Sequence, residues 1–223
     1  IKDTINSYID VLIGNGVHSL ILSAPAGLGK TSIVLDKLES LGFEEDTHYI
    51  YVAGYVTPLK FYEILSGSRI LEKPQIIVLD DIDSLLVNKT SIALMKAALS
   101  EARGKRIVSY ESKGVAEKKF EFTGKMILIS NSLSGNKSLA PLLDRSIVYD
   151  FESDTEELIG YIEQNLDKFG HDLPEDIQWS VWEKIRRFTY MKGFSLRLVE
   201  KAFAMCRNQP DGWYQLFLKS IKR

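Results

Sequence analysis

The feature that most constrains this 223-residue chain is a glycine-rich loop at 23–31, with the sequence SAPAGLGKT. The apolar run at 18–22 before the loop predicts a strand, and the apolar spacing over 32–41 after it predicts a helix. Glycines at such a junction let backbone N–H groups curl around an anion at the positive end of a helix. The loop therefore predicts a phosphate-binding site.

The loop matches the P-loop pattern G-x-x-x-x-G-K-[ST] at every position except the first, where Ala24 replaces glycine. Ala24 fits if its φ is negative, because positive φ is costly for any residue with a Cβ. In this pattern Lys30 reaches the β and γ phosphates of ATP, and the Thr31 hydroxyl is a ligand of Mg²⁺. ATP and Mg²⁺ are thus the expected cofactors. The residues expected to surround the phosphates are Pro25, Ala26, Gly27, Leu28, Gly29, Lys30, Thr31 and Ser32.

Two carboxylates directly follow a second buried strand. The continuous apolar run at 75–79 predicts a strand covered on both faces, and Asp80 and Asp81 come next. We expect Asp80 to complete the Mg²⁺ site with Thr31, and Asp81 to act as general base on the attacking water. The alternative is that Asp80, Asp81 and Asp83 merely solvate a loop, although carboxylates so close together repel one another unless a cation lies among them.

The order of elements predicts an α/β domain at 1–151 and an all-helical domain at 152–223. Strands alternate with helices in the first part, which is typical of a parallel, doubly wound sheet. Two short β-like runs at 106–110 and 119–122 interrupt the alternation and predict a hairpin inserted at about 104–124. Helices alone are expected from about residue 154, at 154–168, 174–190, 195–207 and 211–221.

Composition adds exclusions. With 45% hydrophobic and 26% charged residues, the chain does not have the composition of a disordered or collagen-like protein. Cys206 is the single cysteine, so no internal disulfide forms, and the three histidines have no neighbours at zinc-ligand spacing. No apolar stretch is long enough to cross a membrane, and we expect a cytoplasmic protein without a membrane partner.

A net charge of −2 leaves nucleic-acid binding to a local surface. Residues 103–125, around the hairpin, hold seven basic and three acidic side chains, a local excess of +4. Lys113, Lys118 and Lys119 are the expected DNA contacts, with Tyr110 and Phe120 available to stack on bases. The alternative is an ordinary solvated hairpin.

With the loop and the Asp80-Asp81 pair in place, the chain resembles the AAA+ ATPases over nearly its whole length. The resemblance implies a P-loop parallel sheet sandwiched by helices, followed by a small all-helical lid. That family usually has Asp-Glu where this chain has Asp80-Asp81. The shorter Asp81 side chain implies that ATP hydrolysis is slow.

The resemblance also assigns three further catalytic residues. Asn131, after the apolar run 126–130, looks like sensor 1. Arg145 lies where ring-forming members carry an arginine finger for the neighbouring subunit, and Arg197 looks like sensor 2 in the lid. The alternatives are an Arg145 paired with Asp144 and a solvated Arg197. The resemblance implies a homo-oligomeric ring or spiral, a hexamer being expected, with ATP between subunits.

The segment at 54–57 (GYVT) lies where many AAA+ rings have a pore loop, so Tyr55 is a candidate contact for DNA or peptide, or simply a surface tyrosine. The inserted hairpin resembles the DNA-handling AAA+ branch and superfamily 3 helicases, and the motifs together resemble ATPases of phages and mobile elements. The leading hypothesis is a Mg²⁺-dependent ATPase motor that acts on DNA as a helicase, translocase or loader in replication, recombination or packaging, with a protein partner from those processes. The alternative is a protein remodeller or ATP-dependent switch. A small-molecule phosphotransferase fits least, since Arg145 and the lid would then have no role.

Overall fold

A computed structural model describes residues 1–14, 16–24, 27–67, 76–111, 117–131, 137–150, 155–191 and 194–221. The chain forms two compact units. The first contains residues 1–24 and 29–150, and the second contains residues 151–223 together with the short segment 25–28 of the glycine-rich loop.

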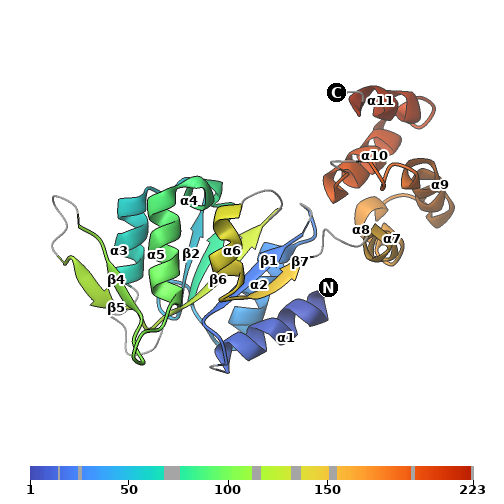
Figure 1. Cartoon of the computed structure of the whole chain (residues 1–223). Helices are drawn as coiled ribbons and strands as arrows, with labels where there is room; N and C mark the ends of the chain where they lie inside the picture. Colours follow the sequence, from blue (N-terminus) through green and yellow to red (C-terminus); the bar gives the residue numbers. More distant parts are fainter. Residues whose placement is uncertain are drawn as a thin grey trace. The chain divides into compact units, whose positions relative to one another are not determined.

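The first unit is built on a five-stranded parallel sheet with strand order β2-β3-β6-β1-β7 (Figure 1). Because every pairing is parallel, the carboxyl ends of all five strands lie at one edge, where ligands of open α/β sheets bind. The glycine-rich loop, Asp81 and Asn131 each follow a strand at that edge. The strands are β1 (Ser19–Ser23), β2 (Tyr49–Ala53), β3 (Ile76–Asp80), β6 (Lys125–Ser130) and β7 (Ile147–Asp150).

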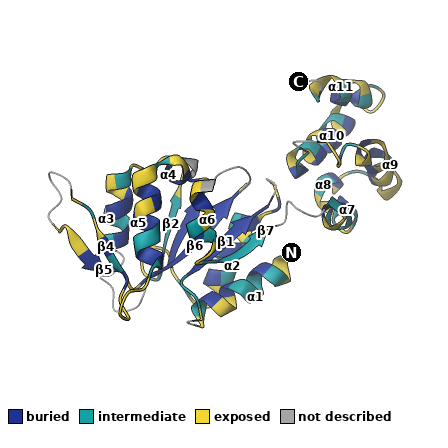
Figure 2. Ribbon diagram, in the orientation of Figure 1, coloured by how far each residue is buried: buried dark blue, intermediate teal, exposed yellow. Residues whose placement is uncertain are grey.

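Helices cover both faces of the sheet, as the sequence predicted. Successive strand residues point to opposite sides, so the apolar strands present side chains that must be covered on both faces. Leu20, Leu22 and Val78 pack with α1 (Lys2–Ile13) and α2 (Lys30–Ser40) on one face. Ile21, Ile77 and Leu79 pack with the helices of the other face, and the three central strands β3, β6 and β1 are buried along their whole length (Figure 2). The helices of that second face are α3 (Pro58–Gly67), α4 (Asp83–Val87), α5 (Lys89–Leu99) and α6 (Ala140–Leu143).

The short elements are those that periodicity did not predict. Helices α4 and α6 and the 3-10 turn η1 (Lys137–Leu139) have three to five residues each, too few to show a helical repeat. The helix expected at 154–168 is two helices, α7 (Thr155–Glu163) and α8 (Leu166–Gly170). The rest of the second unit consists of α9 (Glu175–Arg186), α10 (Leu196–Asn208) and α11 (Trp213–Ser220).

The inserted hairpin is present: β4 (Ile107–Ser109) pairs with β5 (Lys119–Glu121) in antiparallel register. Its aromatic residues face the protein. Phe120 is buried, and its ring and that of Tyr110 lie 5.2 and 5.3 Å from the ring of Tyr62 on α3. The Tyr62 Oη also donates a hydrogen bond to the Glu117 carbonyl at 2.7 Å. The prediction that Phe120 stacks on bases is therefore wrong, and Tyr110 belongs to the same cluster, because this side of the hairpin packs on α3.

The exposed positive charge of the hairpin region is also smaller than the sequence predicted. Arg106 is buried, donates to the Ala98 carbonyl at the end of α5 and lies over the Phe122 ring. Lys125 is buried in β6. Burial lowers the pKa of both groups. Without these two, five basic residues remain against three acidic ones. Of the expected contacts, Lys118 and Lys119 are exposed, whereas Lys113 lies outside the described residues.

Lys125 caps the first helix from the centre of the sheet. Its Nζ donates hydrogen bonds to the carbonyls of Leu12 and Ile13, the latter at 3.1 Å, at the C-terminus of α1. The last carbonyls of a helix have no intrahelical partners, and a cation is favourable near that end of the helix dipole. Lys125 therefore satisfies the end of α1 and attaches this helix to β6.

We expect Lys125→Met to lower the free energy of unfolding by about 2 kcal/mol, because hydrogen bonds from a charged donor to two carbonyls at the end of α1 are lost while the apolar stem is retained. Chemical denaturation, followed through the unfolding transition of the first unit, measures the change. Lys119→Met, on the exposed hairpin strand, is the matched control and should change stability little. An equal effect of the two substitutions would contradict the capping role.

None of the helices in the described part of the chain is long and apolar enough to cross a bilayer.

Candidate nucleotide-binding site

The glycine-rich loop leaves β1 at the centre of the sheet. Ser23 pairs with Ser130 of β6, and the Ala24 N–H donates to the Ser130 carbonyl at 3.3 Å. Ala24 is not among the described residues with positive φ, so alanine is compatible with the first position of the pattern. Gly27 and Gly29 have φ values of +93° and +68°, where a Cβ is strained, and Gly29 is the N-cap of α2. Pro25 and Ala26 lie outside the described residues.

The tip of the loop packs within the second unit. A Cβ added to Gly27 would lie 3.2 Å from the Leu196 Cβ and 3.7 Å from the Arg197 backbone nitrogen, so glycine is needed here for space as well as for conformation. Leu28 is buried, and the Arg197 side chain is exposed. Ser32, on the first turn of α2, is also exposed. Within the second unit, the first turn of α10 therefore lies against Gly27.

One chain of hydrogen bonds links Lys30, Asn131 and Asp81. The Nζ of the buried Lys30 donates to the Ala24 carbonyl and, at 3.2 Å, to Asn131 Oδ1. Asn131 Nδ2 in turn donates to Asp81 Oδ1 at 2.7 Å. This arrangement fixes the orientation of the amide, because the oxygen must face the ammonium and the nitrogen must face the carboxylate. Asn131 thus joins the lysine to the proposed base.

A second group centres on Asp80. This buried carboxylate accepts hydrogen bonds at Oδ2 from Thr31 Oγ1 at 2.7 Å and from Tyr51 Oη at 2.9 Å. Asp80 shares the face of Val78, which packs with α2, so its side chain meets the first turn of that helix. A hydroxyl oxygen beside a carboxylate is a donor set that suits Mg²⁺, a hard cation. Thr31 and Asp80 therefore fit the metal site expected from the sequence.

Tyr51 is a residue of this site that sequence reasoning missed. It lies on β2, which pairs with β3 so that Ala53 is opposite Asp80. Tyr51, two residues earlier, points to the same face of the sheet as Asp80. Burial first, and then the hydrogen bond to Asp80, raises the pKa of Tyr51 to about 12, so the phenol is a proton donor at neutral pH. The signal in the sequence is the pair of tyrosines, Tyr49 and Tyr51, at alternating positions of β2.

Asp81 leaves the strand with an unusual backbone. Its φ is +48°, a left-handed conformation that costs roughly 1–2 kcal/mol for a residue with a Cβ but that aspartate tolerates better than most. The turn sends its exposed carboxylate to Asn131, away from the buried Asp80 carboxylate that meets Thr31. Two adjacent carboxylates thus lie in different surroundings, which suits two different tasks.

Arg145 lies at the other edge of the sheet. It comes two residues before Ile147, which pairs with Leu20 at the start of β1, whereas the glycine-rich loop follows Ser23 at its end. At about 3.3 Å per residue, strands of this length separate the two edges by roughly 15 Å. The structure therefore brings together Lys30, Thr31, Asp80, Asp81 and Asn131, and it does not bring Arg145 to them. Tyr55, in the loop after β2, is 83% exposed.

Comparisons with known proteins extend this picture. No protein-family model matches the chain. A protein of enterobacteria phage T4, named an uncharacterized 36.7 kDa protein in the nrdC-mobD intergenic region, is 27% identical over 92% of this chain and 68% of its own length.

Two solved structures are similar to this chain. The RuvB Holliday junction branch migration motor of Thermotoga maritima matches 99% of this chain and 68% of its own chain, with a TM-score of 0.55 and 16% identity. The C. elegans protein PCH-2 matches 99% of this chain and 64% of its own, with a TM-score of 0.39 and 14% identity. At these identities, the RuvB match establishes a shared fold.

We expect Tyr51→Phe to weaken the binding of Mg·ATP about tenfold, because the carboxylate that holds the metal shell loses a hydrogen bond that orients it. Titration of a fluorescent ATP analogue with and without Mg²⁺ measures this, and binding in EDTA should not change. Tyr49→Phe removes the same hydroxyl from the same strand face and is the matched control. An equal loss in both variants, or a loss that persists in EDTA, would refute the orienting role of Tyr51.

Proposed function

We propose that this chain, which has the fold of the AAA+ ATPases followed by a helical unit, binds and hydrolyses Mg·ATP and uses the cycle to act on DNA in a ring or spiral of identical subunits. A hexamer is the expected size of that assembly. The observation that carries the ATPase proposal is the meeting of the Thr31–Asp80 and Lys30–Asn131–Asp81 groups at the carboxyl edge of the sheet.

In this proposal each residue has a separate task. The glycine-rich loop and Lys30 bind the phosphates, and Thr31 and Asp80 hold Mg²⁺, which would neutralise charge on the phosphate oxygens. Asp81 accepts a proton from the attacking water, and Asn131, already bonded to Asp81, orients the water and the γ-phosphate. Attack of water on the γ-phosphorus releases ADP and phosphate. The short reach of Asp81 supports a slow rate, and Arg197 on α10 is the proposed lid contact.

The position of Arg145 supports an assembly. Its guanidinium lies at the amino edge of the sheet, roughly 15 Å from the carboxyl edge where the phosphates of its own subunit would bind. An arginine that neutralises the γ-phosphate in the transition state must touch it. Arg145 can therefore act only on the nucleotide of a second copy, which places ATP between subunits in this proposal.

We expect Lys30→Ala and Arg145→Ala to be inactive separately and active when mixed. In the mixture, an Arg145→Ala subunit keeps an intact phosphate site, and a Lys30→Ala neighbour supplies the arginine to it. Steady-state ATPase rates of the two variants, alone and combined, measure the recovery. Arg145→Ala mixed with the double variant should stay inactive, since no intact arginine then faces an intact site. Lack of recovery in assemblies that are shown to be mixed would refute action across the interface.

Two observations support DNA as the substrate. Lys118 and Lys119 are exposed on a hairpin inserted before β6, and a motor of related fold, RuvB, is named for branch migration of Holliday junctions. The burial of Arg106 and Lys125 reduces the charge that supported this substrate. A protein remodeller or switch is the second candidate, because the exposed Tyr55 ring could instead grip a polypeptide. A replication or packaging protein remains the proposed partner in either case.

We expect Lys118→Ala/Lys119→Ala to weaken DNA binding and to reduce its salt slope by about 2, since two phosphate contacts are lost. Fluorescence anisotropy with single-stranded and duplex DNA over a range of salt measures this, and the ATPase rate without DNA should not change. Lys201→Ala/Lys219→Ala removes two exposed lysines of the helical unit and is the charge-matched control. If the parent protein shows no salt-sensitive DNA binding and peptides stimulate its ATPase in a Tyr55-dependent way, the remodeller is the correct function.

A further inference from the structure

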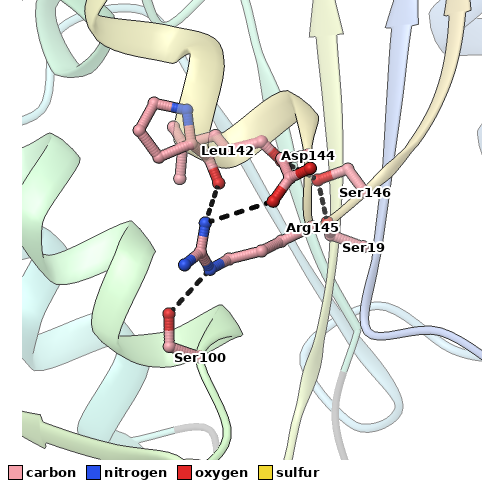
Figure 3. Close-up of polar contacts among 7 residues, drawn as sticks. Ser19, Ser100, Leu142, Asp144, Arg145 and Ser146 are labelled. Carbon is pink, nitrogen blue, oxygen red and sulfur yellow. Dashed lines mark hydrogen bonds and ion pairs between the residues drawn. The ribbon is translucent and has the colours of Figure 1, made fainter.

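The Arg145 guanidinium makes two hydrogen bonds within its own subunit (Figure 3). Its Nε donates to Ser100 Oγ at 2.9 Å, and its Nη1 donates to the Pro141 carbonyl at 2.7 Å. Two bonds to different edges of a planar group fix both its position and its plane. Within the described ranges, Nη2 has no hydrogen-bond partner, so its two N–H groups remain available to an external acceptor.

The charge of Arg145 is only weakly compensated in its own subunit. The nearest carboxylate, Asp144 Oδ2, lies 3.8 Å from Nη1, beyond hydrogen-bond distance, and the Asp144 side chain is 83% exposed. Such an exposed pair contributes little binding energy. The partners that hold the guanidinium, a hydroxyl and a carbonyl, are neutral. Arg145 is therefore oriented without being neutralised, which suits a group that must bind an anion from another subunit.

Ser100 is the more informative of the two partners because it is distant in the sequence. Pro141 lies four residues before Arg145 on the adjoining helix α6, whereas Ser100 is the C-cap of α5, 45 residues away. Its N–H donates to the Lys96 carbonyl at 2.8 Å, and the nearby Ala98 carbonyl accepts from Arg106.

Helix α5 holds this serine firmly. Its inward side chains lie in the core of the sheet's second face, at Ile92, Leu94, Met95, Ala98 and Leu99. The end of the helix is also tied by the hydrogen bonds of Ser100 and Ala98 described above. The Ser100 hydroxyl therefore sits on a rigid element and gives the long, flexible arginine a fixed reference point.

We propose that Ser100 is a positioning residue for ATP hydrolysis: its hydroxyl holds the Arg145 guanidinium in the orientation that meets the γ-phosphate of the neighbouring subunit. The inference rests on the proposed function, because it assumes that Arg145 acts across an interface. Ser100 itself contacts neither nucleotide nor metal in this scheme. Without the hydroxyl, Arg145 keeps its charge and its Pro141 contact but samples more orientations, so the reaction slows while ATP binding is unaffected.

The test compares Ser100→Ala with Ser100→Thr, which keeps a hydroxyl. We expect Ser100→Ala to lower kcat about five- to tenfold, as expected for loss of one intramolecular hydrogen bond, with an unchanged KM for ATP and an unchanged mass of the assembly. Ser100→Thr should restore most of kcat. Ser220→Ala is the matched control, because Ser220 also lies at a helix end and its hydroxyl bonds to a local carbonyl, that of Phe217. This control should leave kcat unchanged.

A double variant separates positioning from a general effect on the fold. In an Arg145→Ala background, Ser100→Ala should cause no further loss of the residual rate, because the group that it positions is absent. A further loss of the same size, or a Ser100→Ala protein with the parent kcat while Arg145→Ala is inactive, overturns the inference and leaves the proposed function standing. If Arg145→Ala itself keeps the parent kcat, the action of Arg145 across an interface fails first, and the role of Ser100 with it.

Discussion

The hydrogen bond from Thr31 to Asp80 connects the two motifs on which the first unit depends. It joins the first turn of α2 to the end of β3, two strands away from the β1 strand that leads into the loop. A buried carboxylate is costly unless donors satisfy it, and here Thr31 and Tyr51 do so from α2 and β2. The pairing of β2, β3, β6 and β1 in parallel register is what brings these donors within reach. The site therefore depends on this strand order.

Long periodic segments and the two motifs were predictable from the sequence. The strand-to-helix junction around Lys30 and the run that ends in Asp80 combine local pattern with local chemistry, and the sheet has the predicted parallel form. The two tyrosines at alternating positions of β2 are visible in the sequence, but the role of Tyr51 could not be assigned from them alone, because it depends on which strand lies beside β3. Arg106 and Lys125 were counted as surface charge, since a sequence pattern does not show that a cation is buried to satisfy helix carbonyls. The positions of Arg145 and Ser100 likewise follow from the tertiary fold.

The two segments proposed to contact substrate, the Tyr55 loop and the inserted hairpin, both adjoin helix α3. Helix α3 begins directly after the loop that carries Tyr55, and its Tyr62 holds the inserted hairpin through Tyr110 and Phe120. The Tyr55 loop is also attached to α4, because the Val56 N–H donates to Ser84 Oγ. Aromatic packing thus attaches the hairpin to α3 and leaves Lys118 and Lys119 exposed to solvent. The exposed surface of these two segments is therefore where a substrate would bind. The rings of Tyr62, Tyr110 and Phe120 have a structural role.

Helix α5 begins at Lys89, shortly after the acidic pair at the carboxyl edge, and ends beside Arg145 at the amino edge. Its 11 residues span about 16 Å. If Arg145 completes a neighbour's site as proposed, this helix is a strut between the nucleotide that a subunit owns and the nucleotide that it helps to cleave. A displacement at one end would reach the other without any intervening hinge. The order in which successive subunits hydrolyse ATP would then depend on how this helix moves against its sheet.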